Sequence, residues 1–342
     1  MRVAMYYNNN DVRLEDLPKP RIKSGELLVR VEASGLCGTD VMEWYRIKKA
    51  PLVLGHEIAG EVVSAGDGVD RYKAGDRVAA SHHVPCGKCH YCQRAHETVC
   101  DTLRETKFYP GGFSEFVRLP SINVASGVYR LPDEVSYEEA TFIEPLACVL
   151  RAQRAAGVRA GDTVLVMGSG ISGLLHIKLA RANGASRIIA TDVVEYRIKA
   201  AENSGADAAI PADRDVPGEI KKANGGRLAD VVVVCAGAKT ANVQALSCVD
   251  RGGTILFFAS SKEDFDLPVS VNHLFWRNEI TLTSSYAGSP QDHLDAMELI
   301  RSRKIDVKDM ITHRLGLGDA LEGFRLVARS GDSIKVIIEP QK

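Results

Sequence analysis

Three side chains near the start of the chain are of the types that bind a transition metal. Cys37 lies in the glycine-flanked stretch 35–40, and His56 and Glu57 follow Gly55 a short way downstream. A thiolate, an imidazole and a carboxylate together suit Zn²⁺, and a site with few protein ligands leaves a coordination position for water or a substrate. One Cys and one His are more often core residues, so this set predicts a catalytic metal only together with further signals.

Four of the eight cysteines are clustered, and they stand at Cys86, Cys89, Cys92 and Cys100. Thiolates spaced this tightly on a loop reach a single tetrahedral zinc ion. Because four thiolates leave no coordination position open, we assign this site a structural role. Two disulfides are the alternative, and an intracellular chain disfavours them. The neighbouring histidines are interpreted as solvated loop residues, and they are His82, His83, His90 and His96.

A glycine-rich segment in the middle of the chain has the spacing of a dinucleotide-binding turn. The segment consists of Gly168, Gly170, Ile171, Ser172 and Gly173. It follows an apolar, β-branched stretch at 163–167 and precedes a helical pattern at 174–182. The first glycine permits the turn, the second lets the backbone approach a pyrophosphate, and the third packs helix against strand. The N-terminus of that helix attracts the phosphates.

An acidic residue follows the second strand of this predicted unit. Asp192 comes directly after the strand at 187–191, at the distance where an acid accepts hydrogen bonds from the adenosine ribose. A carboxylate there repels a 2′-phosphate and favours NAD over NADP, whereas the nearby Arg197 is the argument for NADP. We also assign to the cofactor site the residues after strand 230–234, which are Cys235, Ala236 and Gly237.

The elements that must position these residues divide the chain into two domains. Short strands with glycine-rich turns dominate the N-terminal part, and strand–helix alternation in the central part indicates a doubly wound parallel sheet. The final strand, 334–339, is expected to return to the N-terminal domain. We therefore predict an α/β protein with a β-rich domain at 1–147 and 289–342 and a nucleotide-binding domain at 148–288.

A helical stretch near residue 140 carries an acid in an unusual place. Ser136 and Glu139 have the spacing of a capping box, and the helix continues into an apolar run that contains Glu144. A carboxylate in such a run is unusual unless it is paired or metal-bound. From the local pattern alone, Glu144 is equally well a metal-site residue or a surface acid of the helix.

Overall composition excludes several classes of protein. The formal net charge of the 342 residues is −1, and no run of Lys or Arg occurs, which argues against nucleic acid or an anionic membrane as partner. The N-terminus lacks the apolar core of a signal peptide, and the longest apolar run is far shorter than the ~20 residues that span a bilayer. We therefore expect a cytoplasmic protein.

Together these motifs resemble those of the zinc-dependent medium-chain alcohol dehydrogenase family. The likeness covers essentially the whole chain, and its motifs lie at 35–40, 55–57, 86–100, 144–147 and 168–173. It implies a GroES-like catalytic domain that carries a structural zinc lobe, followed by a Rossmann domain. The context of Glu144 is similar to the sorbitol and threonine dehydrogenase branch, in which an acid replaces the third zinc ligand, a Cys.

The resemblance also implies roles for individual residues. Cys37 and His56 would be ligands of the catalytic zinc, Glu57 a constant or exchanging ligand, and Glu144 bound directly or through water. Thr39 would accept a hydrogen bond from the substrate hydroxyl and pass its proton toward the ribose, while hydride moves to NAD. Two zinc ions per chain and a homodimer or homotetramer are further expectations.

Two departures from the family pattern bear on the substrate. Met42 stands where many relatives have a histidine that relays the proton, and Ser285 stands before Tyr286 where sorbitol dehydrogenases have an arginine. The first leaves Glu43 or water as the proton exit and argues against threonine. The second argues against sorbitol itself. A secondary alcohol of a polyol, cyclitol or sugar-like molecule is therefore the expected substrate, and oxidation to the ketone the expected reaction.

Other functions are weighed against this one. The alternatives are an L-threonine-type amino alcohol dehydrogenase, a non-catalytic NAD-binding protein of the same fold, and a zinc-free enone reductase. The last two predict missing metal-site residues, whereas none is missing here. Four aromatic residues would line the substrate pocket or belong to the core, and they are Trp44, Tyr45, Phe108 and Tyr109.

Overall fold

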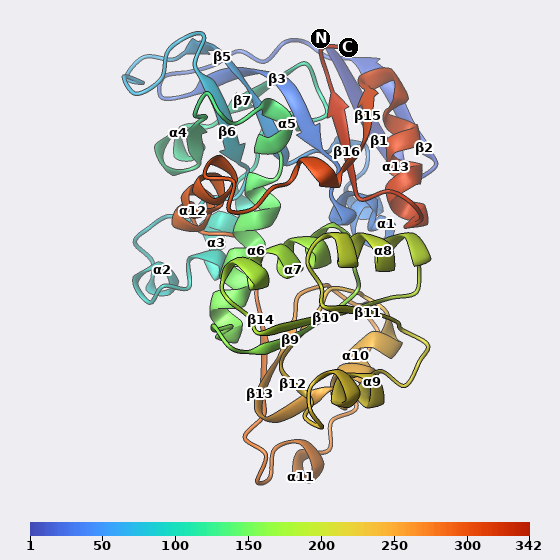
Figure 1. Cartoon of the computed structure of the whole chain (residues 1–342). Coiled ribbons are helices and arrows are strands. Elements are labelled where there is room, and N and C mark those ends of the chain that lie inside the picture. Colours follow the sequence, from blue (N-terminus) through green and yellow to red (C-terminus); the bar gives the residue numbers. More distant parts are fainter. The chain divides into compact units, whose positions relative to one another are not determined.

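A computed structural model describes all residues, 1–342, as two compact units (Figure 1). The first unit contains residues 1–147 and 287–342, and the second contains residues 148–286. The C-terminal segment thus joins the N-terminal unit two residues earlier than the sequence analysis placed the boundary. None of the helices is long and apolar enough to cross a lipid bilayer.

The first unit is built on a seven-stranded sheet. Its order is β15-β16-β3-β5-β6-β8, and β7 pairs with β3. The strands are β3 (Leu27–Gly35), β5 (Glu57–Ala65), β6 (Arg77–Ser81), β7 (Phe116–Leu119), β8 (Val128–Arg130), β15 (Ile311–Gly316) and β16 (Lys335–Glu339). A smaller sheet has the order β2-β1-β4, with β1 (Arg2–Asn8), β2 (Asp11–Asp16) and β4 (Leu52–Val53). The last strand, β16, pairs antiparallel with β3, so the chain returns to the N-terminal domain as predicted.

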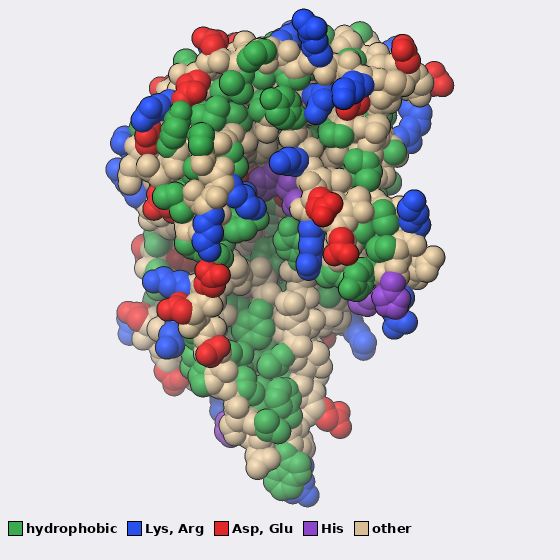
Figure 2. Space-filling view, turned by 180° about the vertical axis from the view of Figure 1, so that it is seen from behind, with side chains coloured by type: hydrophobic (Ala, Val, Ile, Leu, Met, Phe, Trp, Pro, Cys, Tyr) green, Lys and Arg blue, Asp and Glu red, His purple; other side chains and the backbone are tan.

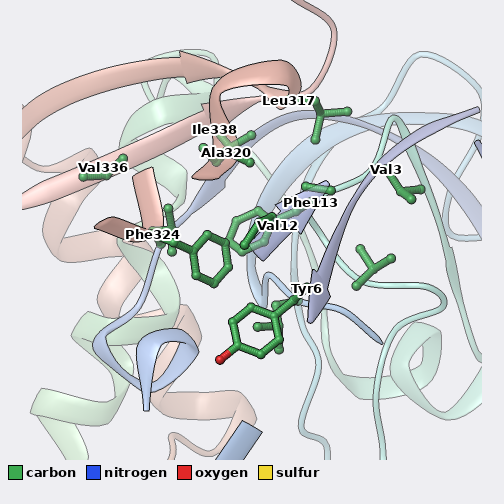
Figure 3. Packing of buried hydrophobic residues seen from close by; sticks show 13 residues of the cluster. Val3, Tyr6, Val12, Phe113, Leu317, Ala320, Phe324, Val336 and Ile338 are labelled. Atoms are coloured by element: carbon green, nitrogen blue, oxygen red, sulfur yellow. The ribbon is translucent and has the colours of Figure 1, made fainter. Parts of the chain in front are cut away.

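Both ends of the chain contribute to one core of the first unit (Figure 3). Tyr6 from β1 packs against Phe324 from α13 (Ala320–Arg329), with ring centroids 5.4 Å apart. Phe113 packs edge-on against the same ring at 5.8 Å. All three side chains are fully buried, and Ile338 of β16 joins the same cluster. This shared apolar core is the physical reason why the unit is discontinuous in sequence.

Several helices accompany the sheets of the first unit. They are α1 (Glu43–Arg46), α2 (His90–Gln93), α3 (Asp101–Glu105), α4 (Ser121–Ser126), α5 (Tyr137–Ala140), α12 (Pro290–Arg301) and α13. A further helix, α6 (Ile143–Ala156), begins in the first unit and continues into the second. The capping box predicted at Ser136 and Glu139 is present at the start of α5. A second capping box, of Ser289 and Asp292, starts α12. Each box satisfies helix N–H groups that have no partner within the helix.

The second unit is a six-stranded parallel sheet with the order β11-β10-β9-β12-β13-β14. This is the doubly wound order that reverses between the first and fourth strands. The strands are β9 (Thr163–Met167), β10 (Arg187–Asp192), β11 (Ala208–Pro211), β12 (Ala229–Val234), β13 (Val249–Phe257) and β14 (Thr281–Ser284). The connecting helices are α7 (Ile171–Ala182), α8 (Glu195–Asn203), α9 (Val216–Ala223), α10 (Lys239–Ala245) and α11 (Val271–Leu274). The expected Rossmann topology is confirmed.

Candidate active site

Strand pairing in the first unit brings the predicted metal ligands together. Cys37 follows the end of β3, and Glu57 begins β5 directly opposite Gly35. The ligand atoms of Cys37, His56 and Glu57 lie within 4.8 Å of one another. Donors on one tetrahedral zinc are about 3.3–3.8 Å apart, as bond lengths of about 2.0–2.3 Å require. The donor types and their grouping therefore fit a zinc ion.

A buried carboxylate orients the imidazole of this group. Asp40 is fully buried, its Oδ1 lies 3.4 Å from Nδ1 of His56, and its Oδ2 accepts a hydrogen bond from the backbone N–H of Cys37 at 3.1 Å. Burial alone would raise the pKa of Asp40, but His56 and Arg46 outweigh it and hold this pKa below its usual value. An acid at Nδ1 leaves Nε2 as the metal-binding nitrogen. We did not expect this role of Asp40 from the sequence.

The hydroxyl of Thr39 lies beside the sulfur of the metal group. Its Oγ1 donates to Cys37 Sγ at 3.3 Å and accepts from Nη2 of Arg46 at 3.3 Å. Arg46 also donates to the Thr39 carbonyl at 2.9 Å and lies 3.5 Å from Asp40. One arginine therefore fixes both the threonine and the carboxylate that orients His56. Arg46 carries no local sequence signal, because its partners lie in the preceding turn rather than on its own helix.

Glu57 is held by a buried lysine from the other end of the chain. Lys335 of β16 and Glu57 form an ion pair, and their residues are 0% and 1% exposed. The Lys335 ammonium also lies 4.9 Å from the ring centroid of Phe142. A Cβ on Gly35 would meet both charged groups, at 2.2 Å from Glu57 and 2.3 Å from Lys335. The glycine two residues before Cys37 therefore makes room for this pair.

Glu144 lies outside the group whose ligand atoms cluster around one point. It is near the start of α6, and together with Glu57 it lines a small cavity in the first unit. Glu57 and Glu144 therefore border the same cavity, although they are far apart in sequence.

His82 and His83 lie beside the predicted metal ligands, so their interpretation as solvated loop residues was wrong. The His82 ring lies 4.8 Å from His56, and His83 lies 3.7 Å from His82, between ring centroids. Burial, followed by the nearby imidazoles, lowers the pKa of His82 well below its usual value, and burial lowers that of His83 to about 4. They follow β6, which pairs with β5, so sheet register rather than local sequence places them here. His90 and His96 are exposed, as expected.

The aromatic residues proposed for a substrate pocket divide into two kinds. Phe108 is 3% exposed and belongs to the core cluster of the seven-stranded sheet, where its edge meets His82. The other three are exposed at the surface, and they are Trp44, Tyr45 and Tyr109. Glu43, considered as a proton exit, accepts a hydrogen bond from the backbone N–H of Asn9 at 3.0 Å.

The four clustered cysteines form a second metal-competent group. All four sulfurs lie within 4.8 Å of one another, and none of the cysteines is in a disulfide. Cys89 and Cys92 are 3.5 Å apart and Cys86 and Cys100 are 3.7 Å apart, measured between sulfurs. A disulfide needs about 2.05 Å, whereas thiolates on one tetrahedral zinc are about 3.8 Å apart. The sulfurs therefore fit the metal interpretation and not the disulfide alternative.

The glycine fingerprint of the second unit joins β9 to α7. Gly168 has φ of 96°, which favours glycine, and Gly170 is the N-cap residue of α7. A Cβ on Gly173 would lie 1.9 Å from the Gly168 carbonyl oxygen, so this position has no room for a side chain. Ile171 and Ser172 form the first turn of α7, where free N–H groups attract phosphate. The segment fits a dinucleotide pyrophosphate.

Asp192 ends β10 beside this turn. Its Oδ2 accepts from the backbone N–H of Ser169 at 2.7 Å, and its Oδ1 accepts from Val193 and Val194 at 2.8 and 2.9 Å. The carboxylate thus fixes the fingerprint turn. The guanidinium of Arg197 lies 3.7 Å from where a Cβ on Gly170 would be. At the neighbouring strand end, Cys235 donates its backbone N–H to Met167, beside the turn.

Comparison with known proteins matches both units. Residues 23–133 match the alcohol dehydrogenase GroES-like domain, and residues 172–302 match the zinc-binding dehydrogenase domain. Sorbitol dehydrogenase from Bacillus subtilis is 31% identical, with 100% of this chain and 98% of that protein aligned. Sorbitol dehydrogenase 1 from Saccharomyces cerevisiae is 32% identical, over 96% and 95% of the two chains.

Solved structures of dehydrogenases superpose on almost the whole chain. Galactitol-1-phosphate dehydrogenase from Escherichia coli superposes with a TM-score of 0.86 at 26% identity, covering 99% of this chain and 100% of that one. A protein from Sinorhizobium meliloti 1021 described as a zinc-binding dehydrogenase, with NADP bound, gives 0.87 at 27%, with 99% of each chain covered. The fold and the two clusters of metal-binding side chains define a two-unit zinc-binding dehydrogenase. The chain belongs to the zinc-dependent medium-chain alcohol dehydrogenase family, as its motifs led us to expect.

Proposed function

We propose that the protein is an NAD-dependent dehydrogenase that oxidises a secondary alcohol of a polyol, cyclitol or sugar-like molecule to the ketone. The observation that carries this proposal is the convergence of Cys37, His56 and Glu57 in a chain that also has a dinucleotide turn. Relatives described as sorbitol dehydrogenases over nearly their full length support the polyol class. The L-threonine-type alternative is disfavoured by Met42, and the non-catalytic alternative by the complete donor set.

The residues of the first unit have distinct roles in this proposal. When bound, the zinc supplies a Lewis acid that lowers the pKa of the alcohol and the dinucleotide supplies the hydride acceptor. Cys37, His56 and Glu57 hold the metal, and Glu144 acts on it directly or through water. Thr39 accepts a hydrogen bond from the substrate hydroxyl and moves its proton away. Asp40 and Arg46 keep His56 and Thr39 in place.

A second zinc, held by Cys86, Cys89, Cys92 and Cys100, stabilises its loop and takes no part in the chemistry. Its sulfurs surround one point, so the site has no position for a substrate. Free thiols in this number also suit a reducing compartment, and we propose the cytoplasm as the location.

NAD is proposed as the preferred cofactor because Asp192 stands at the ribose position. Its carboxylate accepts three backbone hydrogen bonds, so a 2′-phosphate would meet a fixed negative charge. Arg197 beside Gly170 is the group that would favour NADP.

We also propose that the protein is a homo-oligomer. Val271 and Trp276 are 67% and 66% exposed, and β14 is an edge strand with an unpaired side. Figure 2 shows hydrophobic side chains gathered at the lower end, where α11 lies in Figure 1, while charges of both signs are interspersed elsewhere on this face. Exposed apolar residues beside an open strand edge are typical of an interface between copies. The mass in solution, measured by light scattering, tests this assignment.

A panel of polyols, cyclitols and amino alcohols, assayed for reduction of NAD and of NADP, tests the proposed function. We expect turnover of at least one polyol or cyclitol, with a higher kcat/KM for NAD. Turnover of L-threonine alone would support the alternative. No turnover of any alcohol by zinc-loaded protein that binds NADH would favour the non-catalytic alternative.

A further inference from the structure

A small cavity in the first unit lies next to the metal group and is polar on one side. Its volume is about 10 Å³, and its polar lining comes from Glu57, Glu144, Tyr129 and His293. The remaining lining residues are apolar and come from β5, β6, α5 and α6. A cavity of about 10–15 Å³ by this measure holds one water molecule if polar partners are present.

Sheet register places Glu57 on the same face of the sheet as Ala79 and Tyr129, which also line the cavity. Glu57 pairs with Ser81 across β5 and β6, and Ala79 pairs with Tyr129 across β6 and β8. Side chains alternate between faces along a strand, so Glu57, Ala79 and Tyr129 share one face. Glu57, one of the three clustered predicted metal ligands, therefore lies on the same side of the sheet as Tyr129.

His293 lines this cavity, and one of its ring nitrogens has no hydrogen-bond partner in the protein. The residue is 2% exposed, and its ring stacks on Tyr129 with centroids 5.3 Å apart and an interplanar angle of 7°. Nδ1 lies 2.8 Å from the carbonyl oxygen of Ser289, which can only accept, so Nδ1 carries the proton. Burial lowers the pKa of His293, so the ring is neutral and the buried Nε2 is an unsatisfied acceptor.

None of the neighbouring polar groups supplies the missing donor. Glu57 and Glu144 offer carboxylate oxygens, which accept hydrogen bonds, and the Tyr129 hydroxyl donates to the carbonyl oxygen of Ser126 at 3.4 Å. A buried acceptor without a donor costs about 1–3 kcal/mol, so a site of this kind favours a donor molecule of the right size. Water fits both the volume and the need for two donated hydrogen bonds.

We propose that this cavity holds one ordered water molecule, which donates to Nε2 of His293 and to a carboxylate oxygen of Glu57 or Glu144. His293 is then a positioning residue of the catalytic metal site, because it fixes through this water an acid that faces the metal. The inference rests on the proposed function, since it supposes that zinc binds at Cys37, His56 and Glu57. Partners that orient a metal ligand in this way contribute about 10–100-fold to metal affinity or activity.

A crystal structure of the zinc-loaded protein, with data recorded at the zinc absorption edge, tests the occupant directly. We expect density within about 2.7–3.2 Å of Nε2 of His293 and of one carboxylate oxygen, without anomalous signal. An empty cavity overturns the inference, and so does an anomalous peak in the cavity, which would mark a further metal ion. If zinc is absent from Cys37, the proposed function fails. If zinc is bound there and the cavity is dry, only this inference fails.

Two variants test the effect on the metal. His293→Phe keeps the stack on Tyr129 and removes the acceptor, whereas His293→Gln keeps an amide near the position of Nε2. In chelator competition we expect His293→Phe to weaken binding of the catalytic zinc by about 10–100-fold and His293→Gln to lie within a few-fold of the unchanged protein. Binding at the four cysteines should not change in either. Equal affinity for the catalytic zinc in all three proteins would contradict the inference. If the Phe variant does not fold, the crystallographic density decides.

Discussion

At the scale of single residues, the predicted ligands depend on partners that the local sequence does not reveal. Asp40 orients His56, Arg46 fixes Thr39, and Lys335 neutralises Glu57. The ligands themselves were predictable, because Cys37 and the His56-Glu57 pair stand in glycine-flanked motifs. Lys335 was not, because 278 residues separate it from Glu57 and only the pairing of β16 with β3 brings it close.

Thr39→Val tests the assignment of the reacting hydroxyl. The substitution keeps the β-branched shape and removes the only side-chain hydroxyl that the proposal places on the reacting proton. We expect kcat to fall by about 10²–10⁴-fold, while KM and zinc content change little. Thr39→Ser is the control, and it should keep most of the activity because the hydroxyl remains. Nearly full kcat in the Val variant, with both metals present, would mean that the proton leaves by another route.

Lys335→Met tests the buried ion pair. Removing the lysine leaves the Glu57 carboxylate buried without its counter-charge, which costs about 3–5 kcal/mol in the free energy of unfolding. Replacing both partners, in Lys335→Met with Glu57→Gln, should recover most of this loss, because no unpaired charge remains. Urea unfolding of the metal-free proteins gives both values. A single variant as stable as the unchanged protein would show that Glu57 does not depend on Lys335.

At the scale of elements, local signals predicted the starts of helices and the fingerprint turn well. The capping box at Ser136 and the strand–turn–helix context of Gly168 are both present as expected. The location of loop residues could not be predicted as well. We expected His82 and His83 to be solvated, because the loop sequence does not show which strand pairs with the residues before it. The register of β6 with β5 decides their location beside His56.

The dependence of stability on pH should reveal the ion pair between Glu139, in α5, and Arg303. Burial alone would raise the pKa of Glu139, but Arg303 and Ser136 outweigh it and lower this pKa. A lowered pKa stabilises the fold above the unfolded-state value of about 4.3, and this stability is lost as pH falls through the folded-state pKa. Glu139→Gln should therefore be less stable than the unchanged protein at pH 7, and the difference should shrink below about pH 4. Thermal unfolding from pH 3 to 7 measures it, and a difference independent of pH would exclude the charge as its cause.

At the scale of the whole molecule, the sequence predicted two units and the return of the C-terminus to the first. The parallel pairing of the second sheet follows from the alternation of strands and helices, whereas its strand order is seen only in the structure. The shared core of Tyr6, Phe113 and Phe324 explains why residues 287–342 belong to the N-terminal unit. The substrate could not be predicted from the sequence. Met42 argues against threonine and Ser285 against sorbitol, but neither residue identifies another alcohol. A pocket for a particular alcohol depends on side chains that no motif identifies.

Zinc analysis before and after chelation tests whether Cys37, His56 and Glu57 hold a catalytic zinc while the four clustered cysteines hold a structural one. We expect about two zinc ions per chain, of which a chelator removes one together with alcohol oxidation, and added zinc restores both. Cys89→Ser should lower folded yield rather than the turnover of the folded fraction. Full activity in protein that keeps only the zinc of the cysteine cluster would contradict the account.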